Sequence, residues 1–174
     1  LLIPQYRDDG ARLQEWAKAF VMGERTDTLS LLNDLNVGIS ARMSYEARAD
    51  ERTQEPLESI GRGRGTCRDF AVLFVEAARK LGFGARIVSG YLFSPDATLI
   101  GSQDGGATHA WAEIYLPGAG WIAFDPTNRA LGGASLIRVA VARDITQTLP
   151  VSGSYVGVPD DFLGMNVSVS VTPA

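Results

Sequence analysis

The hydrophobic period of this chain changes at Gly82, and that change constrains the fold more than any other feature. Before it, residues 66–81 carry apolar side chains at helical spacing, which predicts an amphipathic helix with one broad buried face. After it, residues 85–93 are rich in strand formers, and residues 109–116 alternate in the manner of a half-buried strand. A short turn then leads to a returning strand at 121–125, which predicts a β-hairpin. Helices followed by an antiparallel sheet define an α+β domain.

Helical patterns dominate the chain before residue 66. Residues 11–22 place apolar side chains on one face, and the glycine that follows is expected to end this helix. A second helix is predicted over 28–35, ending near Asn36 or Gly38, while 39–47 is ambiguous and could be extended. A short third helix is predicted from Pro56, because proline suits the first helical turn. The first part of the chain is therefore predicted to be helical, ahead of the antiparallel sheet.

Length and charge set limits on function. The chain has 174 residues and a mass of 18.7 kDa, which fits one domain. A net charge of −4 and a pI near 5.0 argue against nucleic acid as a partner, because such binding depends on neutralising phosphates. No apolar run of ~18 residues predicts a membrane span. An unpaired cysteine, together with the lack of a visible signal peptide, predicts a cytoplasmic location.

The chain contains one cysteine, Cys67, and one histidine, His109. They cannot supply a Cys/His zinc site, so no metal is expected, and no cofactor is expected because chemistry at a thiol requires none. Cys67 lies in the first turn of its predicted helix, where unpaired N–H groups and the helix dipole favour a thiolate. His109 is predicted to open a strand, and Asp125 to end the next one. Antiparallel pairing would therefore bring them side by side.

Each of these three residues also has an ordinary structural explanation when taken alone. A lone cysteine is usually a small core residue, a lone histidine a surface residue, and an aspartate before proline a turn former. Their combined placement instead indicates a nucleophile, a base and a residue that orients the base.

Three segments resemble the motifs of the bacterial transglutaminase-like superfamily. They are residues 65–71 (GTCRDFA), 109–115 (HAWAEIY) and 120–128 (GWIAFDPTN). The resemblance spans residues 54–129 and extends more loosely to Asp144. It implies a papain-like core in which the helix of the nucleophile packs on an antiparallel sheet. It also implies that Cys67 is the nucleophile, His109 the base and Asp125 the orienting residue.

Further residues are candidates for the same site. The backbone N–H of Cys67 is expected to be an oxyanion donor, because it lies at a helix start. Gln54 is a candidate second donor, with a surface position as the alternative. Trp111 and Trp121 are candidates for the walls of the cleft, with cross-strand core packing as the alternative. Asp69 is expected to serve as a helix-start charge rather than as a catalytic acid.

We expect a single domain over residues 1–174, with a catalytic core at about 24–131 and a strand-rich extension at 132–174. Strand-like alternation occurs within that extension at 136–142 and 167–171. The long segment 94–108 is a candidate lid or substrate loop.

The expected activity is thiol-dependent hydrolysis of a peptide or side-chain amide through a thioester, with a peptide or protein as substrate. Acyl transfer to an amine, as in a glutamine-specific transglutaminase, uses the same triad and stays open. The resemblance favours hydrolysis, because the larger crosslinking members carry extra β domains. A non-enzymatic binding module on the same fold is the further alternative. The sequence leaves the oligomeric state open.

Overall fold

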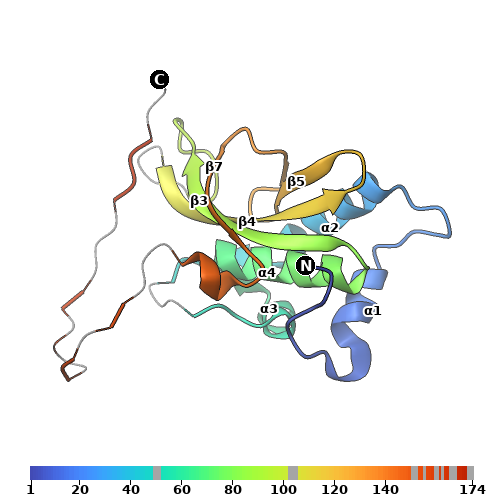
Figure 1. Cartoon of the computed structure of the whole chain (residues 1–174), viewed down its shortest axis with the longest axis horizontal. Coiled ribbons are helices and arrows are strands. Elements are labelled where there is room, and N and C mark those ends of the chain that lie inside the picture. Colours follow the sequence, from blue (N-terminus) through green and yellow to red (C-terminus); the bar gives the residue numbers. More distant parts are fainter. Residues whose placement is uncertain are drawn as a thin grey trace.

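A layer of helices covers one face of an antiparallel sheet (Figure 1). The computed structural model describes residues 1–48, 52–101 and 106–149, and short pieces of the rest: residues 153–154, 156–158, 161, 163–164 and 168–171. The helices are η1 (Asp9–Ala11), α1 (Arg12–Lys18), α2 (Thr28–Arg42), α3 (Pro56–Arg62), α4 (Cys67–Lys80) and η2 (Ile145–Thr148). The strands are β1 (Ser44–Tyr45), β2 (Arg64–Gly65), β3 (Gly84–Phe93), β4 (Gly106–Leu116), β5 (Gly120–Asp125), β6 (Ala130–Leu131) and β7 (Leu136–Ala142). The predicted α+β class is confirmed.

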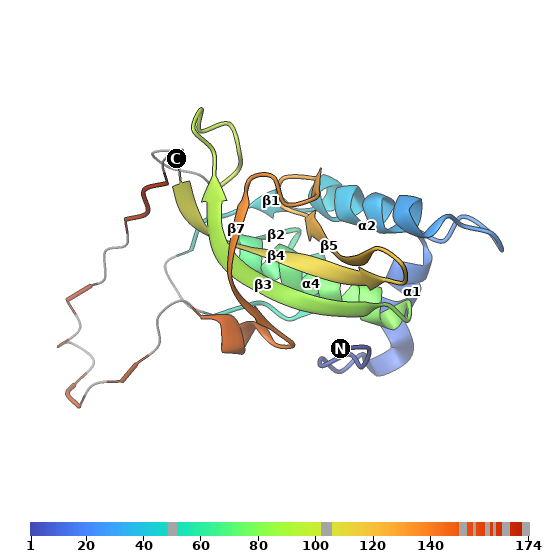
Figure 2. The ribbon, with the colours of Figure 1, turned by 45° about the horizontal axis from the view of Figure 1, so that its top comes forward.

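The main sheet has five strands in the order β6-β5-β4-β3-β7, and every neighbouring pair is antiparallel. Strands β4 and β5 form the predicted hairpin, and β7 lies beside β3 at one edge of the sheet (Figure 2). The short strands β1 and β2 form a separate parallel pair, in which Tyr45 is opposite Gly65. This small pair positions the chain that leads directly into α4.

Helix α4 is the centre of the core. It lies against β3 and β4, with α1 and α3 on its other side (Figure 1). The predicted apolar face is buried, and Phe74 stacks on Phe124 of β5 with the ring centroids 5.2 Å apart. Burying an aromatic side chain of this size contributes roughly 1.5–3 kcal/mol. Packing against both layers therefore fixes the position of this helix and of its first turn.

A buried ion pair holds the other face of α4. Arg79 and Glu76 are each about 1% exposed, and Arg79 Nη1 lies 2.6 Å from Glu76 Oε1. The remaining guanidinium donors reach the carbonyl oxygens of Leu1 (3.2 Å), Ala85 (2.9 Å) and Arg143 (2.8 Å). One side chain thereby connects the N-terminal segment, the start of β3 and the chain after β7 to the end of α4.

Two predicted helix ends are wrong. Helix α2 continues through Gly38 to Arg42, because Gly38 provides space rather than a stop. A β-carbon at Gly38 would lie 2.3 Å from the ring of Phe20. Helix α1 ends at Lys18, before the predicted residue 22, and the last two apolar residues of the predicted helix, Val21 and Met22, are exposed. Without a packing partner for those residues, the local apolar pattern does not extend the helix.

The chain after the β4–β5 hairpin is only partly extended. The strand predicted at 136–142 is confirmed as β7. Residues 168–171 contain no strand, and Val167 lies outside the described residues. Across the described ranges, none of the helices has both the length and the apolar character needed to cross a membrane.

Candidate active site

Cys67 is the first residue of α4, as predicted, and it is partly exposed. Thr66 precedes it in extended conformation, and its N–H donates to Asp69 Oδ2 over 2.7 Å. A β-carbon at Gly65 would lie 2.8 Å from the Asp69 side chain, so glycine is required for this close approach. These contacts define the direction in which the chain enters the helix, and thereby the position of the sulfur.

His109 and Asp125 come together on the hairpin, as their spacing predicted. Nε2 of His109 lies 2.8 Å from Oδ2 of Asp125, and the two residues are 3% and 1% exposed. Strand β4 begins at Gly106, before the predicted start, so His109 lies within the strand, where it pairs with Gly90 of β3. Strand pairing on that side extends β4 beyond the point expected from alternation alone.

The imidazole of His109 also hydrogen-bonds the Cys67 sulfur. Since Nε2 is engaged by Asp125, this contact falls to Nδ1. The backbone N–H of Ala110 is a second donor to the sulfur. Cysteine, histidine and aspartate therefore form one continuous line of contacts, with the ring between the sulfur and the carboxylate.

Electrostatics favour a charged pair in this line. Burial raises the pKa of Cys67, but the His109 contact, the Ala110 N–H and the Arg68 charge outweigh it, and the pKa is lowered. Burial alone would lower the pKa of His109, yet Asp125 and Cys67 raise it to about 10. The pKa of Asp125 is lowered, against the effect of burial, by His109 and Asn128. The arrangement favours a thiolate and an imidazolium held by a carboxylate.

The carboxylate of Asp125 is held by the turn that follows β5. Its Oδ1 accepts from the N–H groups of Thr127 (3.0 Å) and Asn128 (3.3 Å). Its Oδ2 accepts from Asn128 Nδ2 (2.9 Å) in addition to His109. Both oxygens are thus occupied, which fixes the carboxylate relative to the ring. Sequence reasoning assigned Asn128 no role.

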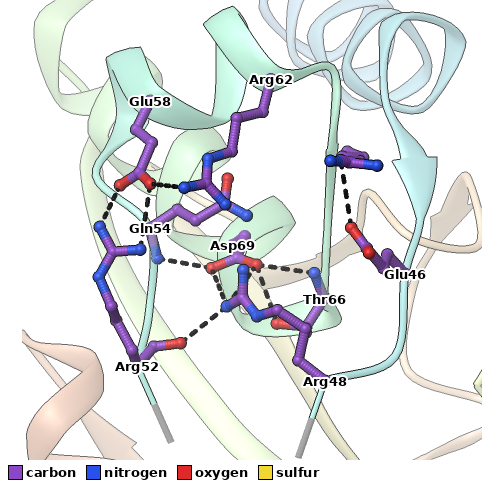
Figure 3. A network of polar contacts seen from close by, with 9 residues as sticks. Glu46, Arg48, Arg52, Gln54, Glu58, Arg62, Thr66 and Asp69 are labelled. Carbon is purple, nitrogen blue, oxygen red and sulfur yellow. Dashed lines mark hydrogen bonds and ion pairs between the residues drawn. The ribbon is translucent and has the colours of Figure 1, made fainter. Parts of the chain in front are cut away.

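Asp69 is the centre of a second polar network, beside the nucleophile (Figure 3). Its fully buried carboxylate accepts from the backbone N–H groups of Gln54 and Thr66, each over 2.7 Å, and pairs with Arg48 over 3.0 Å. Arg48 in turn donates to the Arg52 carbonyl oxygen over 2.7 Å. The side chain is thus the helix-start charge that the sequence suggested, and it also fastens the segment before α3 to the first turn of α4.

Gln54 is 1% exposed, so the alternative of a surface position is wrong. Its backbone N–H, and not its carboxamide, makes the contact with Asp69. Neither carboxamide atom has a hydrogen-bond partner among the described residues. The structure brings the backbone of Gln54 to the first turn of α4 and leaves its buried carboxamide without a partner there.

The two tryptophans lie in different places. Trp111 is fully buried, and its ring stacks on His109 with the centroids 6.2 Å apart. Trp121 pairs with Tyr115 near the turn of the hairpin, under the Arg86 guanidinium. That position is roughly 20 Å along the strand from His109, at about 3.3 Å per residue. Trp111 therefore packs against the His109 ring of the candidate triad, whereas the structure does not bring Trp121 to the triad.

Tyr45 interacts electrostatically with the nucleophile, and sequence reasoning did not identify it. Burial and the charge of Cys67 raise the pKa of its half-buried phenol. A β-carbon at Gly101 would lie 3.3 Å from the Tyr45 hydroxyl oxygen, so the loop after β3 passes close to this ring. Tyr45 therefore links that loop to the surroundings of the nucleophile.

The family model described as the transglutaminase-like superfamily matches residues 14–126. The chain belongs to this superfamily, as its three motifs predicted, and its fold is the papain-like α+β core. The uncharacterized protein ML0607 of Mycobacterium leprae is 37% identical over 101 residues, covering 58% of this chain and 36% of that protein. The chain therefore spans about a third of the length of this relative.

Solved structures share the fold. A candidate cysteine protease from Cytophaga hutchinsonii matches with a TM-score of 0.67 at 27% identity, covering 84% of this chain and 47% of that one. Calcium-bound LapG of Legionella pneumophila matches with a TM-score of 0.56 at 17% identity, covering 79% of this chain and 77% of that one. The superfamily includes cysteine peptidases, which agrees with the kind of site described above.

Proposed function

We propose that this chain is a cysteine-dependent enzyme that hydrolyses peptide or side-chain amide bonds in a peptide or protein substrate. The observation that carries the proposal is the position of the His109 ring between the Cys67 sulfur and the Asp125 carboxylate. A lowered pKa at the thiol and a raised pKa at the imidazole favour the reactive ion pair near neutral pH.

In the proposed reaction, the Cys67 thiolate attacks the amide carbonyl and forms a tetrahedral intermediate. The backbone N–H of Cys67 faces the developing oxyanion from the helix start. Imidazolium His109 gives its proton to the leaving amine, and the C–N bond breaks to leave a thioester on Cys67. Neutral His109 then takes a proton from water, which attacks the thioester and releases the carboxylic acid. Asp125 holds the ring in one orientation through both steps.

Acyl transfer to an amine remains the second candidate, because an amine could replace water at the thioester. A screen of peptide amides, with and without an added primary amine, separates the two by product mass. Hydrolysis yields a free acid under both conditions, and a transglutaminase yields the amine adduct. Cys67→Ala should abolish turnover. A variant that still binds peptides, together with a wild type without turnover, would instead favour a binding module.

The ion pair itself can be tested without a substrate. We expect iodoacetamide to alkylate Cys67 with an apparent pKa well below ~8.5, the value of a free thiol. In His109→Ala the profile should return toward that value, since the positive partner is lost. Intact mass, followed from pH 4 to pH 9, gives the modified fraction. A wild-type profile centred near the free value would refute the proposal.

A further inference from the structure

The carboxamide of Asn128 forms hydrogen bonds with two neighbours. Its Nδ2 donates to Asp125 Oδ2 over 2.9 Å, and its Oδ1 accepts from the N–H of Ile100 over 2.7 Å. The first neighbour is the acid of the candidate triad. The second belongs to the loop that follows β3. Because an amide has a donor end and an acceptor end, asparagine satisfies both contacts with one side chain.

The described part of this loop, residues 94–101, has order of its own. Ser94 Oγ accepts from the Leu99 N–H, and Asp96 accepts from Thr98 Oγ1. These contacts shape the loop internally, whereas the hydrogen bond from Ile100 attaches it to the turn after β5. The loop is therefore a preformed unit with an anchor on the Asp125 side of the site.

The residue after Ile100 approaches a second residue near the site. A β-carbon at Gly101 would lie 3.3 Å from the Tyr45 hydroxyl oxygen, and Cys67 raises the pKa of Tyr45. Two consecutive loop residues thus bond Asn128, which holds Asp125, and approach Tyr45. The loop's position should therefore affect substrate binding at Cys67.

We propose that Asn128 is a positioning residue that serves both parts of the site: it orients Asp125 through Nδ2 and fixes the loop at Ile100 through Oδ1. The inference rests on the proposed function for its meaning in catalysis. Its two contacts predict two separable effects. Loss of the Nδ2 contact should lower kcat, because Asp125 no longer holds His109 firmly. Loss of the Oδ1 contact should raise KM, because the loop is released.

Three variants separate these effects. Asn128→Ala removes both contacts, and Ile100→Pro removes the loop N–H while leaving the contact between Asn128 and Asp125 in place. Asn128→Asp keeps an oxygen for Ile100 but puts a second carboxyl group against Asp125. While that group is protonated it can still donate, so activity should persist at acid pH and fall as the pH rises. Two adjacent carboxylates share a proton and repel each other once both are ionised.

Turnover and amide hydrogen exchange are the two measurements. Asn128→Ala should lower kcat about tenfold or more, as expected for a lost hydrogen bond to a charged group, and should speed exchange at the Ile100 amide at least tenfold. Asn128→Asp should leave exchange at the Ile100 amide unchanged. Its pH profile of activity should be narrower than that of the wild type, because activity is lost at its alkaline side. Ile100→Pro should raise KM and leave the shape of the profile as in the wild type.

The proposal is overturned if Ile100 exchange in folded Asn128→Ala matches the wild type. It is also overturned if the Asn128→Asp profile superimposes on that of the wild type. If the wild type shows no turnover, the proposed function fails, and the titration of His109, the only histidine in the chain, becomes the readout. The extra carboxylate of Asn128→Asp should then raise the pKa of His109, and an unchanged pKa would overturn the inference on its own.

Discussion

Replacing Asp69 with alanine should lower the free energy of unfolding by about 3–5 kcal/mol. Two buried N–H groups, of Gln54 and Thr66, would lose their acceptor at a cost of roughly 1–3 kcal/mol each. Arg48, whose side chain is 14% exposed, would lose its anionic partner. Losing this partner costs less than it would for a fully buried cation, because water reaches Arg48 and the Arg52 carbonyl oxygen still accepts from it.

Urea denaturation followed by circular dichroism measures this loss of free energy. In a thermal melt, the melting temperature should fall by roughly 6 °C or more, at about 2–4 °C per kcal/mol for a chain of this size. Glu58→Ala is the matched control, because Glu58 pairs in the same region with Arg52 and Arg62, whose side chains are at least half exposed. Exposed pairs contribute about 0–1 kcal/mol. An Asp69→Ala loss no larger than the Glu58→Ala loss would refute the assignment of Asp69 as the buried anchor.

Two further predictions concern pH and packing. Between pH 6.5 and 9.0, Cys67 and His109 together hold one proton in both states. The proton is on Cys67 in the unfolded chain and on His109 in the folded ion pair. These two groups therefore add no pH dependence to the stability of the wild type. In Cys67→Ala the folded state keeps a proton on His109 that the unfolded state lacks. The free energy of unfolding should therefore fall with rising pH, by up to roughly 1.4 kcal/mol per pH unit. If urea titrations give parallel curves of unfolding free energy against pH for the wild type and the variant, they contradict the ion pair. Gly38→Ala should lower the free energy of unfolding by about 1–3 kcal/mol, because the new β-carbon would collide with Phe20. Gly61→Ala has open space around it and should raise the free energy of unfolding by about 0.5–1 kcal/mol. Equal midpoints for the two variants in thermal melts would contradict this packing.

The parts of the fold that the sequence predicted are those with a strong local period. Helix α4 and the β4–β5 hairpin carry long, regular apolar patterns, and the predicted hairpin register brings His109 to Asp125. Cys67 was found because a lone cysteine at a helix start combines with a lone histidine and a hairpin aspartate. For these residues, local pattern and tertiary packing point to the same structure.

The remaining features depend on contacts between segments that are distant in the sequence. Gly38 has the local character of a helix stop, and only the ring of Phe20 explains why it lies inside α2. Tyr45 belongs to a two-residue strand, which has no detectable period. Trp121 shares the pattern of Trp111, but strand direction puts it at the other end of the hairpin. No local signal reveals such positions.

The guanidinium of Arg79 acts on the chain as a reversible crosslink. It holds carbonyl groups of Leu1, Ala85 and Arg143, which closes two long loops of the polypeptide at one point. Closing such loops has an entropic cost that grows slowly with their length, so this single junction can hold long intervening segments at little additional cost for each added residue. Variation in the length of surface loops between these three positions should therefore leave the junction, and the helix that carries Cys67, in place.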